Sequence, residues 1–434
     1  MTSPAPTARD AGLSIAVGKE IAGLDPETLA GRFGTPLYVY DLDVITRRVA
    51  ALRAALPARF DLAYAVKANP SLAIVTHLAR LGLGADIASG GEQALVLRAG
   101  FPAERVLFTG PGKSDAELRA AVEGGIGTIT VESPGELERL ERIAASTGRR
   151  MPVLLRLAVG DRSVLEAVRI IGDGGLGKFG MSAADLEASA RRAARSPHLE
   201  LLGVHAFGAS NVRAAGALVE HIGETVSYAQ RVAEGLGVPL RLVDGGGGLG
   251  IPYSDDESPL DLGELRAGLE RLEREWSVDP ALGGLRVLLE PGRFLVGPAG
   301  VYISRVVDVK RLDGRTVAVV DGGIHHVLRP ALVRQGHRVV RLTGDGGTGQ
   351  AAVVGPLCTG LDILSPSAAI GGVAVGDLVA VLDVGAYGFT ESMPLFLSRP
   401  LPAEVVISEG RAALVRPAID PSEFLERQRL PDWE

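Results

Sequence analysis

The pattern of apolar and polar positions changes character once along this chain. From about residue 36 to residue 295, short runs rich in valine, isoleucine and leucine alternate with alanine- and leucine-rich stretches of helical periodicity. The apolar runs include PLYVYD, FDLAYAVKA, RVLFTGP, MPVLLRLAV and LRVLLEPGR. Continuous apolar strands separated by helices predict a parallel sheet covered on both faces. About eight such repeats predict closure into a (β/α)8 TIM-like barrel.

After about residue 295 the strands follow one another and leave little room for helices. Runs such as GVYISRVVDVKRL, RTVAVVDGG, DLVAVLDVG and AEVVISEGRAALVRP are separated by glycine-rich turns, which is typical of an antiparallel β domain. We therefore expect an α/β protein with a barrel over residues 36–295. Residues 1–35 and 296–434 would form the second, C-terminal antiparallel β domain.

Composition and charge narrow the function classes. The 434 residues suit two domains, and a net charge of −7 argues against a nucleic-acid or anionic-membrane partner. No apolar stretch is long enough to span a bilayer, and the first residues lack the order of a secretion signal. The single cysteine excludes an internal disulfide and makes a zinc cluster improbable, so we expect no metal. A cytoplasmic location follows by default.

One apolar run carries a lysine, Lys67 in DLAYAVKANPSL. An unpaired ammonium in a dry strand would be costly. Lysine occurs at only five positions of this arginine-rich chain, and unlike arginine it can lose its proton and act as a nucleophile. For an arbitrary lysine, a charged head that reaches solvent at a strand end would be the commoner explanation.

Other polar residues follow the predicted strands, and active sites of α/β barrels gather at the carboxyl ends of strands. Each has an ordinary explanation alone, such as a turn or a structural ion pair. Together they suit pyridoxal phosphate: backbone N–H groups of a glycine-rich loop and an arginine for its phosphate, a carboxylate for its ring nitrogen, and a lysine for a Schiff base with its aldehyde. The residues are Lys67, Asp86, Arg156, the HAFGAS loop, Gly245–Gly248 in DGGGGLG, Glu290 and Arg293.

The chain resembles the alanine-racemase-fold (fold type III) pyridoxal phosphate decarboxylases, the group of diaminopimelate, ornithine and arginine decarboxylases. The motifs that carry the resemblance are YAVKANP, ADIASGGE, DGGGGLG, EPGRFLV, GPLCTGLDIL and GAYG. The resemblance implies a Schiff base at Lys67. It also implies that Asp86 and Glu92 lie near the cofactor. The expected cofactor-binding residues are Lys67, Asp86, Arg156, His205, Phe207, Ser210, Gly246, Gly247, Gly248, Glu290, Arg293 and Tyr387.

The resemblance also gives the lone cysteine a role. In this family the cysteine-bearing β domain reaches into the neighbouring subunit's barrel, so a homodimer with shared active sites is implied. Cys358 would protonate the substrate carbon after CO2 leaves, although burial in an apolar core is the commoner fate of a free thiol. Glu290 favours decarboxylation over racemisation, because alanine racemases place an arginine at the ring nitrogen. A non-catalytic cofactor-binding protein would lack the β domain.

Several positions depart from the familiar members. Phe207 stands where a histidine stacks on the ring, and His205 either points to the same site or packs as a core histidine. Thr359 follows the cysteine, where diaminopimelate decarboxylases have glutamate and ornithine decarboxylases aspartate, each a partner for the substrate's distal amine. In RPALV, Arg329 keeps the place of a carboxylate-binding arginine but Val333 replaces a tyrosine. We count Arg329, Thr359 and Asp362 as substrate-side residues.

These departures resemble a natural-product subgroup that includes decarboxylases of glutamyl groups tethered to a carrier protein, together with siderophore-pathway enzymes. VDGGIHHV, GGGLGIPYS and GPGKSDAEL carry that likeness. A tethered substrate has no free distal amine or carboxylate, which fits Thr359 and Val333. His325 and His326 would line its entrance or pack within the β domain. We expect a decarboxylase of an amino acid or a carrier-bound derivative; the alternatives are diaminopimelate decarboxylase of lysine biosynthesis and a same-fold racemase or epimerase.

Overall fold

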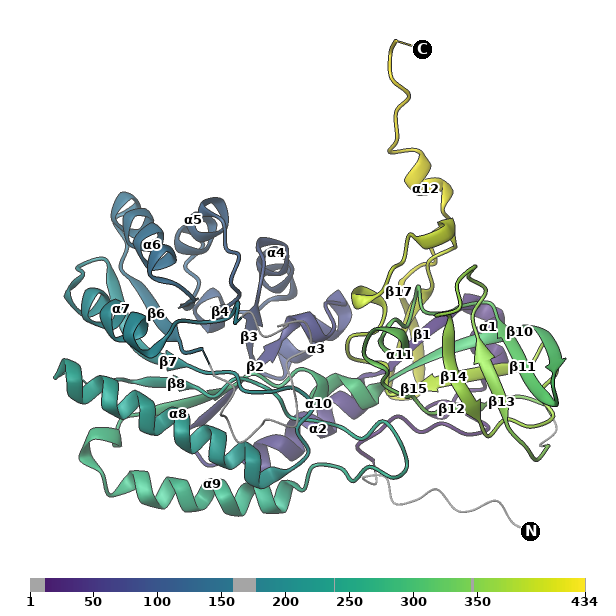
Figure 1. Cartoon of the computed structure of the whole chain (residues 1–434), viewed down its shortest axis with the longest axis horizontal. Coiled ribbons are helices and arrows are strands. Elements are labelled where there is room, and N and C mark those ends of the chain that lie inside the picture. Colours follow the sequence, from purple (N-terminus) through teal and green to yellow (C-terminus); the bar gives the residue numbers. More distant parts are fainter. Residues whose placement is uncertain (1–11, 159–176, 238, 345–346, 434) are drawn as a thin grey trace. The chain divides into compact units, whose positions relative to one another are not determined.

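The computed structural model describes residues 12–158, 177–237, 239–344 and 347–433. The chain divides into two compact units (Figure 1). The barrel unit comprises Val49–Ile251 and Pro259–Phe294, and the β unit comprises the chain up to Arg48, Pro252–Ser258 and the chain from Leu295 onward. Residues 1–11 of the expected β domain lie outside the described residues.

The barrel unit is built on a closed ring of parallel strands paired in chain order from β2 to β9. The ring closes where β2 pairs with β9, with Phe60 opposite Val287. Inside, Ala63, Leu107, Leu154 and Leu288 form one buried cluster, as the packed interior of such a barrel requires. The strands are β2 Phe60–Ala65, β3 Gly84–Ile87, β4 Val106–Phe108, β5 Thr128–Val131, β6 Met151–Arg156, β7 Leu199–His205, β8 Leu242–Asp244 and β9 Arg286–Leu289.

Helices surround this ring, and several begin at residues whose side chains cap them. Ser114 and Glu117 form a reciprocal capping box at the start of α5, and Asp261 accepts two backbone N–H groups at the start of α9. The helices are α2 Leu42–Ala54, α3 Leu72–Arg80, α4 Gly90–Ala99, α5 Asp115–Glu123, α6 Pro134–Thr147, α7 Ala183–Arg195, α8 Ala215–Leu236, α9 Leu262–Ser277 and α10 Arg293–Val296. Short 3-10 turns are η1 Val66–Ala68, η2 Ala103–Arg105 and η3 Pro280–Leu282.

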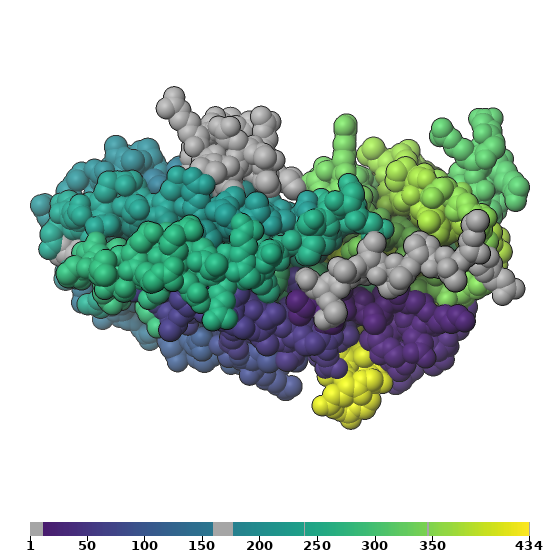
Figure 2. Space-filling model, turned by 90° about the horizontal axis from the view of Figure 1, so that it is seen from below, coloured from purple at the N-terminus to yellow at the C-terminus, as the bar shows by residue number. Residues whose placement is uncertain are grey.

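Helices α8 and α9 lie side by side on the outside of the barrel, as the teal and green surfaces of Figure 2 show. Gly268 of α9 makes the close approach possible, because a Cβ atom there would lie 2.6 Å from a methyl group of Val219 in α8. This packing fixes the two helices that flank the last strands of the ring.

The β unit contains a nine-stranded sheet among its described residues, with the order β14-β13-β11-β10-β1-β16-β17 and with β15 and β12 branching from β10. Most pairs are antiparallel, but β1 pairs with β16 and β11 with β13 in parallel. The strands are β1 Leu37–Asp41, β10 Gly300–Leu312, β11 Arg315–Val320, β12 Val339–Arg341, β13 Ala351–Val354, β14 Ile363–Ala368, β15 Leu378–Leu382, β16 Ala403–Ser408 and β17 Arg411–Arg416. Its helices and 3-10 turns are α1 Pro26–Phe33, α11 Arg329–Val333, α12 Ser422–Leu425, η4 Gly297–Ala299, η5 Phe389–Glu391 and η6 Phe396–Ser398.

The predicted fold class is confirmed, with two local differences. The run PLYVYD, expected to open the barrel, forms β1 of the other sheet, where every residue of the strand is buried. Lys67 does not lie inside a strand either, because β2 ends at Ala65 and the lysine follows in turn η1. Among the described residues, no helix combines the length and apolar character needed to cross a bilayer.

Candidate active site

Lys67 lies just beyond the carboxyl end of β2, where the chain leaves the ring. Its Nζ donates a hydrogen bond of 2.8 Å to Asp86 Oδ2, at the end of β3. The lysine side chain is 44% exposed while that of Asp86 is 1% exposed. The carboxylate is therefore fixed, and the amine it holds remains accessible to a small molecule.

Asp86 is oriented by a second partner. Thr109, which follows β4, donates its hydroxyl to Asp86 Oδ1 at 2.6 Å. Ala65, the last residue of β2, stands opposite Asp86 in the register. The ends of three neighbouring strands thus contribute a series of two hydrogen bonds that joins Thr109, Asp86 and Lys67.

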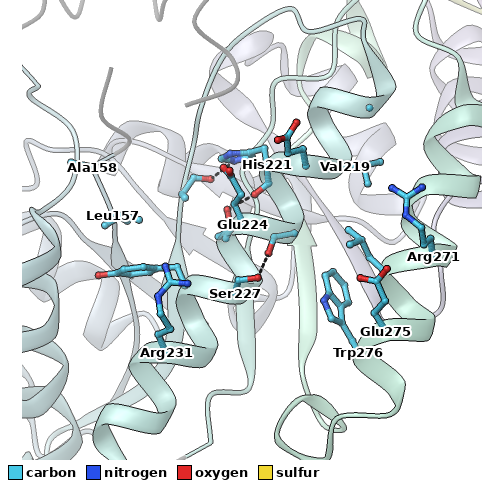
Figure 3. Close-up of a pocket in the computed structure, with 17 residues that line it drawn as sticks. Leu157, Ala158, Val219, His221, Glu224, Ser227, Arg231, Arg271, Glu275 and Trp276 are labelled. Carbon is cyan, nitrogen blue, oxygen red and sulfur yellow. Dashed lines mark hydrogen bonds between the residues drawn. The ribbon is translucent and has the colours of Figure 1, made fainter. Parts of the chain in front are cut away.

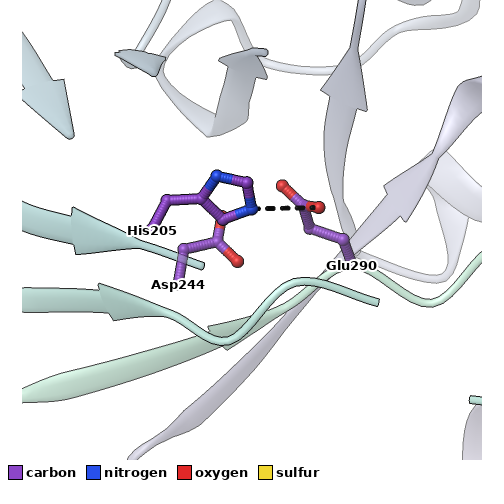
Figure 4. Close-up of side chains that lie close together, drawn as sticks. All are labelled: His205, Asp244 and Glu290. Carbon is purple, nitrogen blue, oxygen red and sulfur yellow. Dashed lines mark ion pairs between the residues drawn. The ribbon is translucent and has the colours of Figure 1, made fainter. Parts of the chain in front are cut away.

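His205, Asp244 and Glu290 form a buried cluster at three neighbouring strand ends (Figure 4). They follow one another around the ring: His205 ends β7, Asp244 ends β8 and Glu290 comes directly after β9. One side-chain atom from each lies within 4.8 Å of the others, and His205 Nε2 is 3.8 Å from Glu290 Oε2. Neither ring nitrogen of His205 has a hydrogen-bond partner among the described residues.

Burial governs the charge of this cluster. It raises the pKa of Glu290 well above the usual range, and the neighbouring carboxylates of Asp244 and Asp86 raise it further. Burial raises the pKa of Asp244 to about 7, against the lowering effect of its bonds to Glu290 and Gly246. The pKa of His205 is well below its usual value because of burial and the nearby charges of Arg156 and Lys67. The cluster therefore has a neutral imidazole and two carboxyl groups for which no lysine or arginine among the described residues forms an ion pair.

The glycine run after β8 packs too closely for side chains. Gly246 and Gly248 have φ values of 68° and 92°, in the left-handed region. A Cβ on Gly246 would lie 2.9 Å from the ring of Phe207, and one on Gly248 would lie 2.5 Å from the carbonyl of Ala209. Gly246 also donates its N–H to Asp244 Oδ1 at 2.8 Å, which fixes the turn.

Ser210, Phe207 and Arg293 adjoin this loop. Arg293, 5% exposed, donates to the Ser210 hydroxyl at 3.3 Å, and the aromatic ring of Phe207 lies against Gly246 and Gly247. The structure thus brings together an arginine, a hydroxyl and a glycine-rich turn. This combination is suited to an anion such as a phosphate.

Arg156, at the end of β6, is held by a buried carboxylate that the motifs did not indicate. Its Nη1 lies 2.6 Å from Glu132 Oε1, which also accepts the N–H of Gly110. The other oxygen of Glu132 accepts the N–H of Gly180. Next to it, Lys113 and Glu136 form a second buried ion pair of 2.8 Å.

The cysteine segment belongs to the β unit. Cys358 is exposed, and Thr359 is partly buried. Asp362 is 3% exposed and accepts the N–H groups of Ile324 and Leu357, each at 2.8 Å. The sequence predicts a substrate-side role for Asp362. Its two oxygens instead tie the cysteine loop to a neighbouring segment, which favours a supporting role.

Arg329 is also in the β unit, in α11, and is 4% exposed. It forms an ion pair of 2.8 Å with Glu391, and its guanidinium lies 5.1 Å from the ring centre of Tyr387. His325 and His326 are fully buried, with ring centres 3.7 Å apart. Of the two explanations for these histidines, the structure favours packing within the β domain.

A hollow of about 860 Å³ lies elsewhere in the barrel unit (Figure 3). Helices α8 and α9 line it on the outside of the barrel, with side chains that include His221, Glu224, Arg231, Arg271 and Trp276. None of the predicted site residues lines it. The ligand-binding candidates therefore stay at the strand ends.

Comparison with known proteins supplies the family. The model of the family described as "Pyridoxal-dependent decarboxylase, pyridoxal binding domain" matches residues 42–297, more than half of the chain. The chain belongs to this family. It is a fold type III pyridoxal phosphate-dependent decarboxylase of the diaminopimelate and ornithine group.

Curated relatives match almost the whole length of this chain. The chain is 33% identical to diaminopimelate decarboxylase of Zymomonas mobilis over 93% of this chain and 95% of that protein. The corresponding enzyme of Pseudomonas aeruginosa is 36% identical, with 91% and 92% covered. L-glutamyl-[BtrI acyl-carrier protein] decarboxylase of Niallia circulans is 31% identical, with 89% and 92% covered.

Solved structures agree with the fold. Diaminopimelate decarboxylase of M. jannaschii matches with a TM-score of 0.89 at 26% identity, covering 98% of this chain and 99% of that one. The enzyme of Helicobacter pylori complexed with L-lysine matches with a TM-score of 0.83 at 28% identity, covering 92% and 99%.

The residues of the barrel unit fit pyridoxal phosphate. A buried pair of carboxyl groups without a cation suits a protonated ring nitrogen, the accessible amine of Lys67 suits an aldehyde, and the glycine turn leaves room for a phosphate. The same donor set of His205, Asp244 and Glu290 could chemically accept a metal ion. Because the chain belongs to a pyridoxal-dependent family, we assign the cluster to the cofactor's ring nitrogen as an expectation.

Four residues of these arrangements were missed in the sequence. Asp244 stands directly before the glycine run, so its place after a strand was a usable signal. Thr109, Glu132 and Glu391 offered no motif, because their partners lie 23, 24 and 62 residues away along the chain.

The enzyme loaded with pyridoxal phosphate should be yellow, and Lys67→Ala should lose the visible band because no amine remains to bond the aldehyde. Absorption spectra after gel filtration would measure this. Lys178→Ala, which removes another exposed barrel lysine, should keep the band. An unchanged spectrum in Lys67→Ala would remove this lysine from the site.

The carboxyl cluster predicts a pH dependence of the cofactor-free protein. The pKa of Asp244 rises from 3.8 to about 7 on folding, so unfolding releases a proton between these values and rising pH favours the unfolded chain. Asp244→Asn should therefore gain thermal stability relative to the wild type as pH rises from about 5 to 8. Calorimetric melting curves would measure the difference, with the exposed Asp61→Asn as the control. A difference that does not vary with pH would contradict the raised pKa.

Proposed function

We propose that this enzyme removes the α-carboxylate of an amino-acid derivative whose side chain has no free distal ammonium group, foremost an aminoacyl group attached to a carrier protein. The observation that carries the proposal is Thr359, directly after Cys358. A hydroxyl offers a distal ammonium no counter-ion, so a substrate with that charge would lose its partner. The similarity to a glutamyl-carrier-protein decarboxylase supports the same substrate class.

The residues of the barrel unit would hold the cofactor in one orientation. Lys67 would hold the aldehyde covalently, and Asp86 would keep the amine in place through its 2.8 Å bond. The N–H groups of Gly246–Gly248, the Ser210 hydroxyl and Arg293 would bind the phosphate, with Tyr387 beside them. Phe207 would present an aromatic face to the ring without a proton to exchange.

Glu290 would decide the reaction type. Bound pyridoxal phosphate supplies an electron sink, which is strongest while its ring nitrogen is protonated. Burial disfavours an unpaired carboxylate at Glu290, so this group would either carry a proton or lie beside a protonated partner. The carboxyl group and the ring nitrogen would therefore share a proton. His205, neutral and also buried, would not compete for this position.

Cys358 would supply the proton that replaces CO2 on the α-carbon. Its exposed position in the β unit suits a thiol that enters a site formed with a second copy of the chain. We therefore include a homodimer with shared sites in the proposal. The cytoplasmic location expected from the sequence stays a prediction.

Diaminopimelate decarboxylation is the second candidate function. Most of the curated relatives named above have this activity, and solved structures of such enzymes match nearly the whole chain. Racemisation is less consistent with the site, because a carboxyl group rather than an arginine follows β9 at the ring-nitrogen position.

A CO2-release assay would test the substrate class. The holoenzyme should release CO2 from a glutamyl or related aminoacyl carrier-protein thioester, and much more slowly from free diaminopimelate, ornithine or lysine. Because an unpaired distal ammonium loses a charged hydrogen bond, we expect a preference of roughly tenfold or more. Rapid turnover of free diaminopimelate with no activity on thioesters would instead establish the second candidate.

Mixing two inactive variants would test the shared site. Lys67→Ala and Cys358→Ala should each turn over poorly, and Cys358→Ala should keep the visible band. In a mixture allowed to exchange subunits, half of the dimers would contain one of each, with one intact site. Activity should then return to roughly a quarter of the wild-type value. No recovery despite demonstrated exchange would mean that both residues act within one subunit, and full activity of Cys358→Ala would exclude the thiol.

A further inference from the structure

The Arg329 guanidinium has partners on two of its nitrogens and on its planar face. Nη1 donates to Glu391 Oε2 at 2.8 Å, Nε donates to Gln335 Oε1 at 3.3 Å, and the planar face lies over Tyr387. The side chain is 4% exposed, so the ion pair is formed largely out of water. This arginine is neutralised by a carboxylate of its own chain.

Glu391 is held in place by the segment around it. It ends turn η5, and the next residue, Ser392, accepts the N–H of Leu328 at 3.1 Å while donating to the carbonyl of Gly388. Leu328 directly precedes Arg329 in the chain. The two segments that carry the ion pair are therefore joined, one position away from each residue, by a hydrogen bond from the backbone N–H of Leu328 to the Ser392 side chain.

Tyr387, which the proposed function assigns to the cofactor, lies 5.1 Å from the Arg329 guanidinium. Its φ of 53° lies in the left-handed region, which is costly for a tyrosine and is typical of functional turns. Val333 lies four positions after Arg329, on the same face of α11, and offers only carbon atoms. At position 333 the helix therefore adds no hydroxyl to the surroundings of Arg329.

We propose that Glu391 is a specificity-determining residue that occupies the carboxylate-binding position of Arg329, so that the enzyme discriminates against substrates with a free distal carboxylate. The inference rests on the proposed function and extends it. A substrate carboxylate would have to displace the carboxylate of Glu391 from Arg329. Because Glu391 is part of the same chain, its effective concentration at Arg329 is high, and it has the advantage over a free carboxylate. With Thr359 near the cysteine, the distal part of the substrate is then an uncharged group such as an amide or thioester.

Calorimetric titration of the holoenzyme would test the assignment without turnover. Heptanedioate and heptanoate differ only in the second carboxylate, and neither has an amine that reacts. The wild type should bind the two with similar affinity. Glu391→Gln should bind heptanedioate about tenfold or more tightly while heptanoate stays unchanged, because Arg329 then lacks its charged partner.

The controls separate charge from folding. If the glutamine of Glu391→Gln still hydrogen-bonds Arg329, Glu391→Ala should show the tighter binding of heptanedioate instead. The double variant Glu391→Gln with Arg329→Gln should bind heptanedioate no more tightly than the wild type. Glu409→Gln removes an exposed glutamate that pairs with Arg411 at 3.0 Å, and it should resemble the wild type. Melting temperatures of all variants would show that they fold.

The outcomes are distinct. Equal affinities in every variant, or a wild type that already prefers heptanedioate tenfold, would overturn the role of Glu391. A role of Glu391 as counter-ion for a distal amine would appear as tighter lysine binding that Glu391→Gln abolishes, and this would also overturn it. If no carrier thioester releases CO2 but Glu391→Gln binds heptanedioate more tightly as expected, the proposed function is rejected. The assignment of Glu391 then remains.

Discussion

The arrangement of this enzyme depends on a pair of buried carboxyl groups for which the described residues provide no lysine or arginine ion-pair partner. Asp244 and Glu290 end neighbouring strands of the ring, and both are almost entirely removed from water. Two carboxyl groups in such a place repel each other and hold protons that they would lose in solvent. A cation placed beside them, such as the protonated ring nitrogen of pyridoxal phosphate, would relieve this repulsion. Without such a cation the raised pKa values make the pair a cost to stability at neutral pH.

The other parts of the barrel unit follow from that requirement. A cofactor whose ring nitrogen lies beside these carboxyl groups would also need binding groups for its phosphate and its aldehyde at matching positions. The glycine turn approaches Phe207 and Ala209 more closely than any side chain would allow. Lys67 lies in the short turn that follows strand β2 of the barrel, not in the strand itself. Asp86 and Thr109 then limit the freedom of the amine. Rigid strand ends thus hold the reactive groups, which keeps the cost of ordering them low.

Much of this organisation could be predicted from the sequence, because strand ends in a barrel converge whatever joins them. Lys67, Glu290 and the glycine run stand beside apolar runs, so their common edge followed from periodicity alone. The strand β1 could not be assigned this way, since a continuous apolar run does not reveal which sheet it joins. Glu132 and Glu391 could not be found either. Their importance comes from partners that only the folded chain brings near, as Arg329 with its neutralising carboxylate shows.

Asp362 has a consequence for how such enzymes diversify. Its carboxylate secures the cysteine loop by accepting the backbone N–H groups of Leu357 and Ile324, each at 2.8 Å, whereas Thr359 Oγ1 accepts only a longer bond of 3.3 Å from the N–H of Leu361. The side chain of residue 359 contributes nothing to those two bonds. Evolution can therefore exchange that side chain for another without displacing the thiol next to it. Selectivity and proton delivery occupy adjacent positions, yet natural selection can alter one while preserving the other.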